Sequence, residues 1–529
     1  MAPMMMEQLG DDHHVKVFRG TLVHTPLYGQ MDMLLDRIVV VIGAKIDQIV
    51  HGDAEGEVLA SLGVSPEQVT RLQDGQFLMP GLIDTHVHAP QYKFTGTGTD
   101  VPLMEWLKKY TFPAETSFQD LEQARHRYDL LVKRFLSNGT TTATYFGSLH
   151  IEPNKVLVDS IVRLGQRAVV GKVNMDRESP DNYIEGTAQG LADAEEFVQG
   201  MHRAWRTRRS LYNMDNNIEG TAQGLADAEE FVQYALATKC SRVYPCITPR
   251  FIPTCTMESM KGLAAIARKY DVHIQSHISE CCGEVSFSRH LHPEFRCDAH
   301  VFDEAGLLTN KTLMAHGTLL DDDAIRLLVE RGTSVSHCPL SNFFLGDAWF
   351  RVNHTMNLGL KVGLGTDVAG GISASMLTSI RMAVVNARCL RAHKLHVKGG
   401  FDNKMTARFT VTPDMEEDLI SYKEGLYLAT MGSARAINID DKVGSFEVGK
   451  EWDALLVDVN VPGGPFDIFD GDSMEDQFEK FINLGDDRNI VEVYVQGTCV
   501  KRGDEFTGDT SKPVPVAPSD PKKRKGADC

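Results

Sequence analysis

The sequence has little of what marks a secreted, membrane-bound or nucleotide-dependent protein. Only 10 of its 529 residues are cysteine, and their spacing forms no disulfide framework. Apolar runs such as Ile38–Gly43 fall far short of the ~20 residues that cross a bilayer. No G-x-G-x-x-G turn follows a strand, and no P-loop lysine motif occurs. We therefore expect reduced thiols, no membrane span, and neither dinucleotide nor ATP chemistry.

Positive charge is also scarce. The chain has 54 Lys+Arg against 72 Asp+Glu, a net charge of −18, whereas phosphate contacts require a basic face. A nucleic-acid partner is therefore not expected. The N-terminus lacks the basic region and apolar core of a secretory signal, which predicts a cytoplasmic chain. Pro521–Lys525 resembles a nuclear import signal, and a solubilising basic tail is the alternative interpretation.

Short β-like runs at both chain ends flank a long middle in which helical and strand patterns alternate. This order predicts an α/β fold: a (β/α)8 TIM barrel over residues 79–437, and a small β-sandwich domain built from residues 15–78 and 438–503. Residues 1–14 are predicted to be a flexible tail and residues 504–529 a disordered basic tail. The runs expected to form the barrel strands are Phe77–His86, Thr140–Phe146, Arg167–Val173, Val243–Arg250, His273–His277, Thr312–His316, Ser334–His337 and Val362–Asp367.

One segment of sixteen residues, IEGTAQGLADAEEFVQ, occurs twice without a change, at Ile184–Gln199 and at Ile218–Gln233. The offset of 34 residues matches a helical repeat, but solenoids contain three or more diverged copies. One barrel helix needs only one copy. We therefore predict that, within residues 182–233, one copy and the linker Gly200–Asn217 loop out of the core. A recent duplication or a gene-model error would explain the pattern.

Residues able to bind a metal fall at the ends of the predicted strands, and the active site of a barrel forms at the carboxyl ends of its strands. His86 and His88 are two residues apart and therefore face the same side of a strand, while His277, His316 and Asp367 end three later strands. Imidazole and carboxylate suit Zn²⁺ or Fe²⁺ with an open position for water. We take His86, His88, His277 and Asp367 as the ligands of one ion. His316 is then a hydrogen-bond partner of the bound water or a weak ligand.

Glu280 follows His277 by three residues and is expected in the loop above the metal. This position suits a proton shuttle. An ordinary carboxylate on a surface loop is the alternative.

Several motifs together resemble the amidohydrolase superfamily: PGLIDTHVHAPQY, HIQSHISE, AHG, SHCP and GLGTDVAGG. Others resemble the guanine deaminase family within it, namely PLMEWLKKYTFPAE, GKVNMD, ITPRF and FEVGKEWDA. This resemblance extends from about Phe77 to Gly497, apart from the duplication. It implies a site with one Zn²⁺ per chain, with Fe²⁺ still open, and a homodimer. No lysine lies where a carbamate bridge would need one, so Lys172 is expected to be structural.

The resemblance also implies that guanine is hydrolysed to xanthine and ammonia by a metal-activated water. Glu280, Asp367 and His316 would be the catalytic residues, with the two carboxylates shuttling protons. Arginine can donate to a purine carbonyl and an aromatic ring can cover a flat base, but Arg250 could instead pair with a carboxylate and Phe251 could belong to the core. The implied substrate contacts are His88, Gln91, Arg250, Phe251, His277, Glu280 and Asp367.

Two other functions stay open at the level of the sequence. One is a deaminase or chlorohydrolase that acts on a different aminated or halogenated heterocycle, which a substrate panel with ammonia detection would distinguish. The other is a non-catalytic, amidohydrolase-like scaffold. The complete set of candidate metal ligands argues against a scaffold, and metal analysis tests it.

Overall fold

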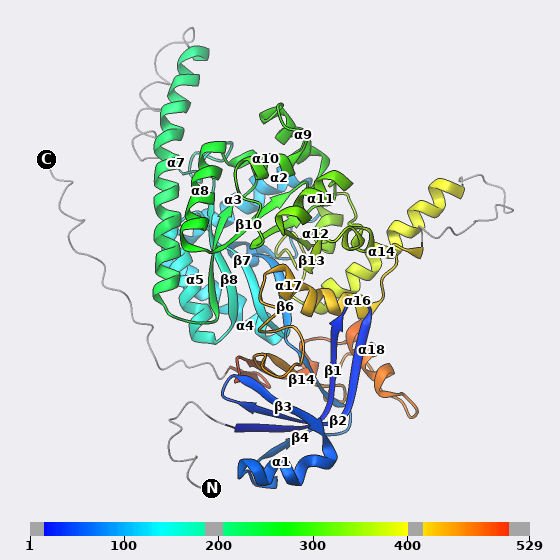
Figure 1. Ribbon diagram of the computed structural model, residues 1–529. Coiled ribbons are helices and arrows are strands. Elements are labelled where there is room, and N and C mark those ends of the chain that lie inside the picture. Colours follow the sequence, from blue (N-terminus) through cyan, green and yellow to red (C-terminus); the bar gives the residue numbers. More distant parts are fainter. Residues whose placement is uncertain (1–14, 186–204, 400–415, 507–529) are drawn as a thin grey trace.

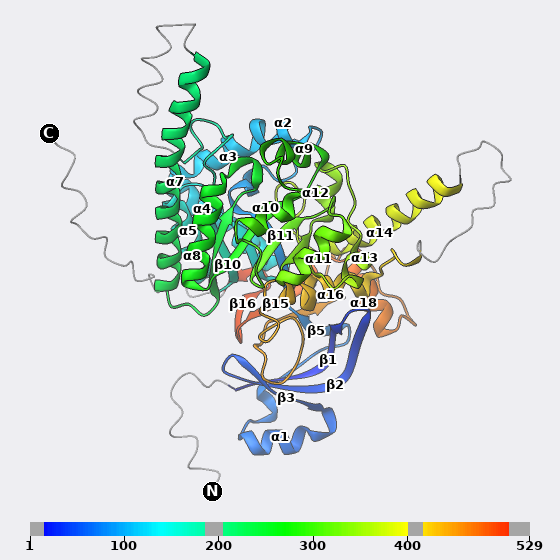
Figure 2. The same ribbon diagram turned by 45° about the horizontal axis from the view of Figure 1, so that its top comes forward.

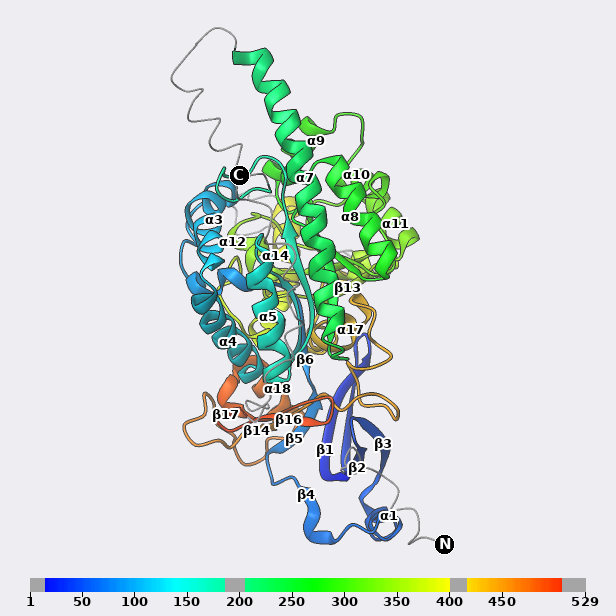
Figure 3. The same ribbon diagram turned by 90° about the vertical axis from the view of Figure 1, so that its left-hand side faces the viewer.

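The computed structural model describes residues 15–185, 205–399 and 416–506. Residues 1–14 and 507–529, which include Pro521–Lys525, lie outside the described residues, and so do most residues of the first repeat copy. The described residues form a barrel stacked on a sheet that contains both chain ends (Figures 1 and 3). None of their helices combines the length and the hydrophobicity needed to span a bilayer.

Eight parallel strands form the barrel, each hydrogen-bonded to the next one along the chain. The backbone N–H of Asp367 donates to the carbonyl of His86 (2.8 Å), and the N–H of His88 donates to the carbonyl of Val368 (2.8 Å). These bonds bring the end of the last strand to the first strand and nearly close the barrel, which confirms the predicted fold class. The strands are β6 (Leu82–His88), β7 (Thr140–Phe146), β8 (Arg167–Asn174), β9 (Val243–Pro249), β10 (His273–Ile278), β11 (Thr312–His316), β12 (Ser334–His337) and β13 (Lys361–Leu364).

Two of the predicted strands differ from the observed ones by more than one residue at an end. The run Phe77–His86 is divided at Gly81, because β5 (Gln76–Pro80) belongs to the chain-end sheet and β6 begins at Leu82. A Cβ atom at Gly81 would lie 2.1 Å from Thr141 Oγ1, so glycine is needed where the chain passes between the sheets. The last barrel strand stops at Leu364, and Asp367 follows it in a loop.

Helices surround the barrel, and α4 (Leu121–Ser137) shows why they form. Ala124, Tyr128, Leu131 and Phe135 recur every three or four residues on one face, and all are fully buried. Asp120 caps the helix by accepting two backbone N–H groups of the first turn. The other helices of the barrel body include α5 (Ile151–Leu164), α7 (Trp205–Ala237), α8 (Met257–Tyr270), α9 (Cys282–Leu291), α10 (Asp298–Glu304), α11 (Asp322–Arg331), α12 (Pro339–Phe344), α13 (Val352–Asn357), α14 (Met376–Gly399), α16 (Tyr422–Tyr427) and α17 (Ser433–Ala436).

The second repeat copy lies within α7, which runs along the outside of the barrel beside α5 (Figure 3). Phe231 is buried in the main core, and Thr221 Oγ1 donates to Asp176 Oδ2 at 2.6 Å, just beyond the end of β8. Residues 186–199 of the first copy lie outside the described residues. The predicted looping out of one copy therefore stays a prediction.

The beginning of the first copy is described, and it is anchored. Glu185 is buried, and its Oε1 accepts from Lys172 Nζ (2.5 Å) and from Asn174 Nδ2 (2.8 Å) on β8. This pairing agrees with a structural role for Lys172. Asn174 Nδ2 also donates to the carbonyl of Gly224 in the second copy (2.9 Å). The start of one copy and the body of the other therefore meet at the same strand.

Both chain ends form one mixed sheet of nine strands, as expected for a composite β domain. β5 and β14 pair antiparallel and join the N-terminal strands to the C-terminal ones. The sheet curves, since Phe18 and Val39 of one half share a core with Trp452 and Tyr494 of the other. The last strand, at residues 505–506, lies within the segment 504–529 that the sequence predicts to be a disordered tail, so ordered structure continues past the predicted boundary. The strands are β1 (Val15–Leu27), β2 (Gln30–Ile42), β3 (Lys45–His51), β4 (Val69–Arg71), β5, β14 (Ala454–Asp458), β15 (Ile490–Val495), β16 (Thr498–Arg502) and β17 (Glu505–Phe506).

A buried ion pair fastens the barrel to this sheet. Arg167, at the start of β8, is fully buried and donates to Asp453 Oδ2 (2.6 Å) and Oδ1 (3.1 Å), and also to Glu451. Buried charges are costly unless they are paired. The arginine of the barrel base and the carboxylates next to the chain-end sheet therefore stabilise each other. The carboxyl ends of the strands form the opposite end of the barrel, on the side of α2 (Leu103–Trp106) and α9 (Figures 1 and 2).

Candidate metal centre and substrate pocket

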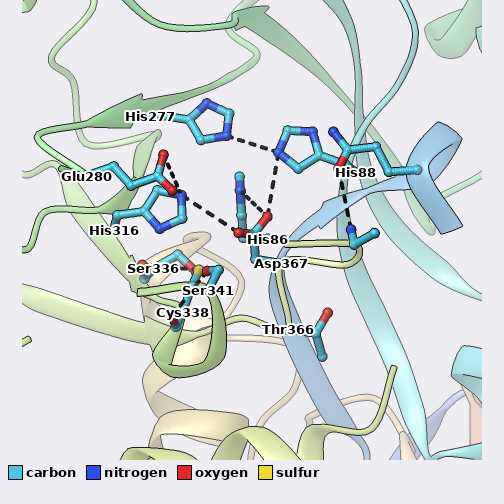
Figure 4. A network of polar contacts seen from close by, with 12 residues as sticks. His86, His88, His277, Glu280, His316, Ser336, Cys338, Ser341, Thr366 and Asp367 are labelled. Carbon is cyan, nitrogen blue, oxygen red and sulfur yellow. Dashed lines mark hydrogen bonds and ion pairs between the residues drawn. The ribbon is translucent and has the colours of Figure 1, made fainter. Parts of the chain in front are cut away.

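Four histidines and one aspartate converge at the carboxyl ends of β6, β10 and β11 and in the loop after β13 (Figure 4). The Nε2 atoms of His88 and His277 are 3.0 Å apart. Asp367 Oδ1 lies 3.2 Å from His86 Nε2 and 3.6 Å from His88 Nε2. His316 completes the group, and all five side chains are buried. The structure therefore brings together every metal ligand that the sequence predicts.

The cluster contains buried nitrogen atoms without hydrogen-bond partners among the described residues, which fits a site for a divalent cation better than a closed hydrogen-bond network. His86 Nε2 and His88 Nδ1 are buried, and no hydrogen bond from another described residue reaches either atom. Burial lowers the pKa of His86, His88 and His277 well below the usual value, so these rings are neutral. His277 Nδ1 donates to the carbonyl of Arg250 at 2.6 Å, which leaves its Nε2 as a ligand atom. Neutral imidazoles with a carboxylate form the donor set of Zn²⁺ and Fe²⁺ sites.

Three residues of the site have a left-handed backbone: Ser279 (φ 48°), His316 (φ 72°) and Asp367 (φ 48°). Such conformations cost about 1–3 kcal/mol each outside glycine, and they persist only where the surrounding structure holds them. Asp367 is held by its bond to the backbone of His86, and the N–H of Gly317 donates to the carbonyl of Ile278 at 2.9 Å. His316 and Asp367, two of these three residues, belong to the cluster.

Glu280 lies beside the cluster, with its Oε2 3.7 Å from His316 Nε2 (Figure 4). The residue is only 5% exposed, which excludes an ordinary surface carboxylate. Burial, together with the negative charge of Asp367, raises the pKa of Glu280 to about 8. A carboxyl group with this pKa can hold or release a proton near neutral pH.

Carboxylates from α9 and α10 support the turn that carries Glu280. The N–H of Glu280 donates to Glu284 Oε2 at 2.6 Å. Ser279 donates to Asp298 Oδ2 through its backbone (3.2 Å) and its hydroxyl (2.8 Å). No pattern in the sequence indicates Glu284 or Asp298, because both act through contacts that the fold creates.

Asn342 of α12 orients His316 and was also missed. Its Oδ1 accepts from His316 Nδ1 at 3.0 Å, which leaves Nε2 unprotonated toward the cluster. Asn342 lies three residues after the SHCP motif. That proximity is the one sequence signal that could have indicated it.

A pocket with about 380 Å³ of space between protein atoms, part of it open to solvent, lies beside the cluster. One wall is apolar and comes from the motif PLMEWLKKYTFPAE. The pocket is lined by His88, Gln91, Leu103, Trp106, Leu107, Arg250, Phe251, His277, Glu280, His316, Leu345 and Asp367. Every predicted substrate contact is therefore part of the pocket lining.

Two of these predicted contacts are tied to one carboxylate, that of Glu115 in α3 (Phe112–Thr116). Gln91 Nε2 donates to Glu115 Oε1 (2.8 Å), and Arg250 donates to Oε2 (2.8 Å) and Oε1 (3.2 Å). Arg250 thus pairs with a carboxylate, as the alternative interpretation held, and also lines the pocket. Phe251 is buried and lines the pocket too. Glu115 ends the motif PLMEWLKKYTFPAE, but no role was predicted for it.

Three comparisons relate the chain to proteins of known activity. The amidohydrolase family profile matches residues 77–500. Guanine deaminases of Dictyostelium discoideum and Homo sapiens are 36% and 38% identical to the chain, over 92% of its length and 98% and 96% of theirs. A crystal structure of guanine deaminase from C. acetobutylicum, with guanine bound in its active site, superposes with a TM-score of 0.75 at 30% identity, over 92% of this chain and 100% of that one.

Proposed function

The chain belongs to the amidohydrolase family, and from this premise we propose that it hydrolyses guanine to xanthine and ammonia. One observation carries the proposal: a buried histidine–aspartate cluster and the polar groups of Gln91 and Arg250 line the same pocket. The cluster suits hydrolysis, and the polar groups suit recognition of a flat, oxygenated heterocycle. The guanine deaminase relatives identify that heterocycle as guanine.

His86, His88, His277 and Asp367 would hold one divalent cation per chain. We propose zinc, because three imidazoles and a carboxylate match its preferred ligands, with Fe²⁺ as the alternative. When bound, the cation lowers the pKa of water to ~7 and so supplies a nucleophile at neutral pH. The other steps belong to the side chains of the chain itself.

Recognition comes first. Phe251 stacks on the purine, Arg250 donates hydrogen bonds to it, and Gln91 accepts or donates at its edge. The apolar side chains Leu103 and Trp106 exclude bulk water from one wall. This arrangement holds the amino-bearing carbon beside the metal cluster.

Proton transfers follow. Glu280 donates a proton to a ring nitrogen, which makes the amino-bearing carbon electrophilic. Asp367 accepts a proton from the attacking water, and His316, held by Asn342, hydrogen-bonds that water. The C–N bond breaks once the amino group is protonated, so one water is consumed and one ammonia is released. Acid–base assistance of this kind contributes ~10²–10⁴-fold to the rate.

The test is an ultraviolet assay of guanine loss with ammonia detection, performed with and without a chelator. We expect one ammonia per guanine, no turnover after chelation, and recovery with Zn²⁺. Turnover of another heterocycle in place of guanine would transfer the assignment to a different deaminase or chlorohydrolase. A chain that holds metal and converts no member of the panel would be a scaffold.

The resemblance to guanine deaminases also leads us to propose a homodimer and a cytoplasmic location. Light scattering coupled to gel filtration measures the first. Imaging of the full chain beside a variant without Pro521–Lys525 measures the second, and an unchanged distribution would remove the import signal from consideration.

A further inference from the structure

Glu115 lies behind the pocket and is fully buried, and it is not one of the residues that line the pocket. We infer that Glu115 is a positioning residue that determines which hydrogen-bond pattern the pocket accepts. It would act by fixing the direction of the Gln91 amide and the plane of the Arg250 guanidinium. The inference rests on the proposed function and adds to it the origin of substrate selectivity.

The direction of the Gln91 amide follows from the chemistry of its neighbour. An ionised carboxylate can only accept hydrogen bonds, so the Gln91 NH₂ group must face Glu115 Oε1 at 2.8 Å. If the amide were flipped, the Gln91 oxygen and Glu115 Oε1, both hydrogen-bond acceptors, would lie 2.8 Å apart. The Gln91 oxygen is left on the other side, where the N–H of Ala369 approaches it at 3.4 Å. Gln91 therefore offers a ligand an acceptor.

The guanidinium of Arg250 is fixed by the same carboxylate. Two of its five N–H groups donate to the two oxygens of Glu115, at 2.8 and 3.2 Å. The guanidinium also lies over the Phe112 ring, with 5.5 Å between its central carbon and the ring centroid. No other described residue accepts a hydrogen bond from the guanidinium, so its remaining N–H groups can donate to a ligand, and Glu115 neutralises the positive charge. Arg250 thus suits a neutral carbonyl oxygen better than an anion.

An acceptor on Gln91 and donors on Arg250 match one kind of heterocycle edge, a ring N–H next to a C=O. Guanine has this edge at N1 and C6. In 2,6-diaminopurine both groups are reversed, because N1 is unprotonated and C6 carries an amino group. A site built for hydrogen bonds rejects a mismatched ligand strongly, since its buried polar groups are then left unpaired. Without the carboxylate, the Gln91 amide can rotate and accept either edge.

The test compares Glu115→Gln with the wild type by the KM and kcat for guanine and the inhibition constant of 2,6-diaminopurine. We expect KM for guanine to rise ~10–100-fold, as expected for losing a charge-assisted hydrogen bond. The inhibition constant should stay the same or fall, and kcat should change less than KM. A support of the fold alone would weaken both ligands equally, and that result would overturn the inference.

Asp453→Asn is the matched control, because Asp453 and Arg167 form a buried two-point pair of the same kind at the base of the barrel. This variant should lower thermal stability and leave the ratio of KM to the inhibition constant unchanged. Glu115→Asp keeps an acceptor-only group and should keep the preference for guanine, with weaker binding. If Glu115→Gln fails to fold, loss of that preference in Glu115→Asp would overturn the inference. A wild type that does not deaminate guanine refutes the proposed function instead.

Discussion

The two ends of the barrel bury charge in opposite ways. At the base, the charge of Arg167 is matched by Asp453 and Glu451, so the protein itself supplies the opposite charges. At the mouth, Asp367 and Glu280 are equally buried, but within the described chain neither forms an ion pair with a lysine or an arginine. Their near neighbours are histidines that burial keeps neutral. The base therefore supplies the opposite charges for its buried arginine. The two carboxylates of the mouth have no lysine or arginine partner among the described residues, which suits a site for a cation.

This contrast follows from the cost of buried charge. An unpaired ion in a protein interior costs several kcal/mol. The mouth can lower that cost by keeping a proton, which the raised pKa of Glu280 reflects, or by holding a cation. Four predictions test the contrast.

The largest effect is expected from His277→Ala at the mouth. The substitution removes one of two Nε2 atoms that lie 3.0 Å apart. Metal affinity should fall by more than the ~10–100-fold typical of losing an outer partner of a ligand, and guanine turnover should fall below detection. Elemental analysis and the ultraviolet assay measure the two changes. Full metal content in this variant would remove His277 from the ligand set.

Glu280→Gln should separate chemistry from metal binding. We expect kcat to fall ~10²–10⁴-fold because proton transfer is lost. Metal content should stay at the wild-type value, since Glu280 is not one of the predicted ligands. Near-normal turnover would contradict the shuttle role.

A smaller effect is expected at the base from His273→Gln. His273 Nε2 donates to the carbonyl of Ile437 (2.9 Å), and burial lowers the pKa of this histidine to about 4. In the unfolded chain, His273 binds a proton once the pH falls below its usual pKa of about 6.5. In the folded chain, it binds that proton only below about pH 4. The free energy of unfolding should therefore fall as pH drops through this window, by up to about 1.4 kcal/mol per pH unit.

Glutamine can still donate a hydrogen bond to the carbonyl of Ile437, but it does not titrate. The free energy of unfolding of the variant should therefore fall less than that of the wild type between pH 6.5 and 4. Urea unfolding across that range measures the difference, and guanine turnover at pH 7 is the control for an intact mouth. Parallel stability curves would show that His273 makes no such contribution.

The smallest effect is expected in the barrel wall, between the two ends. Deleting residues 186–219 joins Glu185 to Gly220 and restores a single unbroken copy of IEGTAQGLADAEEFVQ. Turnover and metal content should stay the same. The melting temperature should be unchanged or higher, because a shorter connection costs less closure entropy. A deletion variant that fails to fold would place the first copy in the core.

Local patterns in the sequence were enough to predict most of the barrel strands and which histidines and aspartate lie together in one cluster. His86 and His88 lie on the same face of a strand because side chains alternate with a period of two residues. His277 and His316 lie at the carboxyl ends of their strands, where a barrel has its active site. Glu115 is different, because its partner Arg250 is 135 residues away and only the closed barrel brings them together. The division of the first predicted strand at Gly81 likewise depends on a contact with Thr141, which no local pattern reports.

Barrel closure also determines when the site can exist during synthesis. The hydroxyl and the N–H of Thr366 bond to Asp84 across 282 residues, immediately before Asp367. At ~5–20 residues per second, a ribosome needs roughly 15–60 s to extend a nascent chain over that distance. Until then the histidines have emerged without their carboxylate partner. The proposed set of four metal ligands is therefore complete only after the barrel seam has formed.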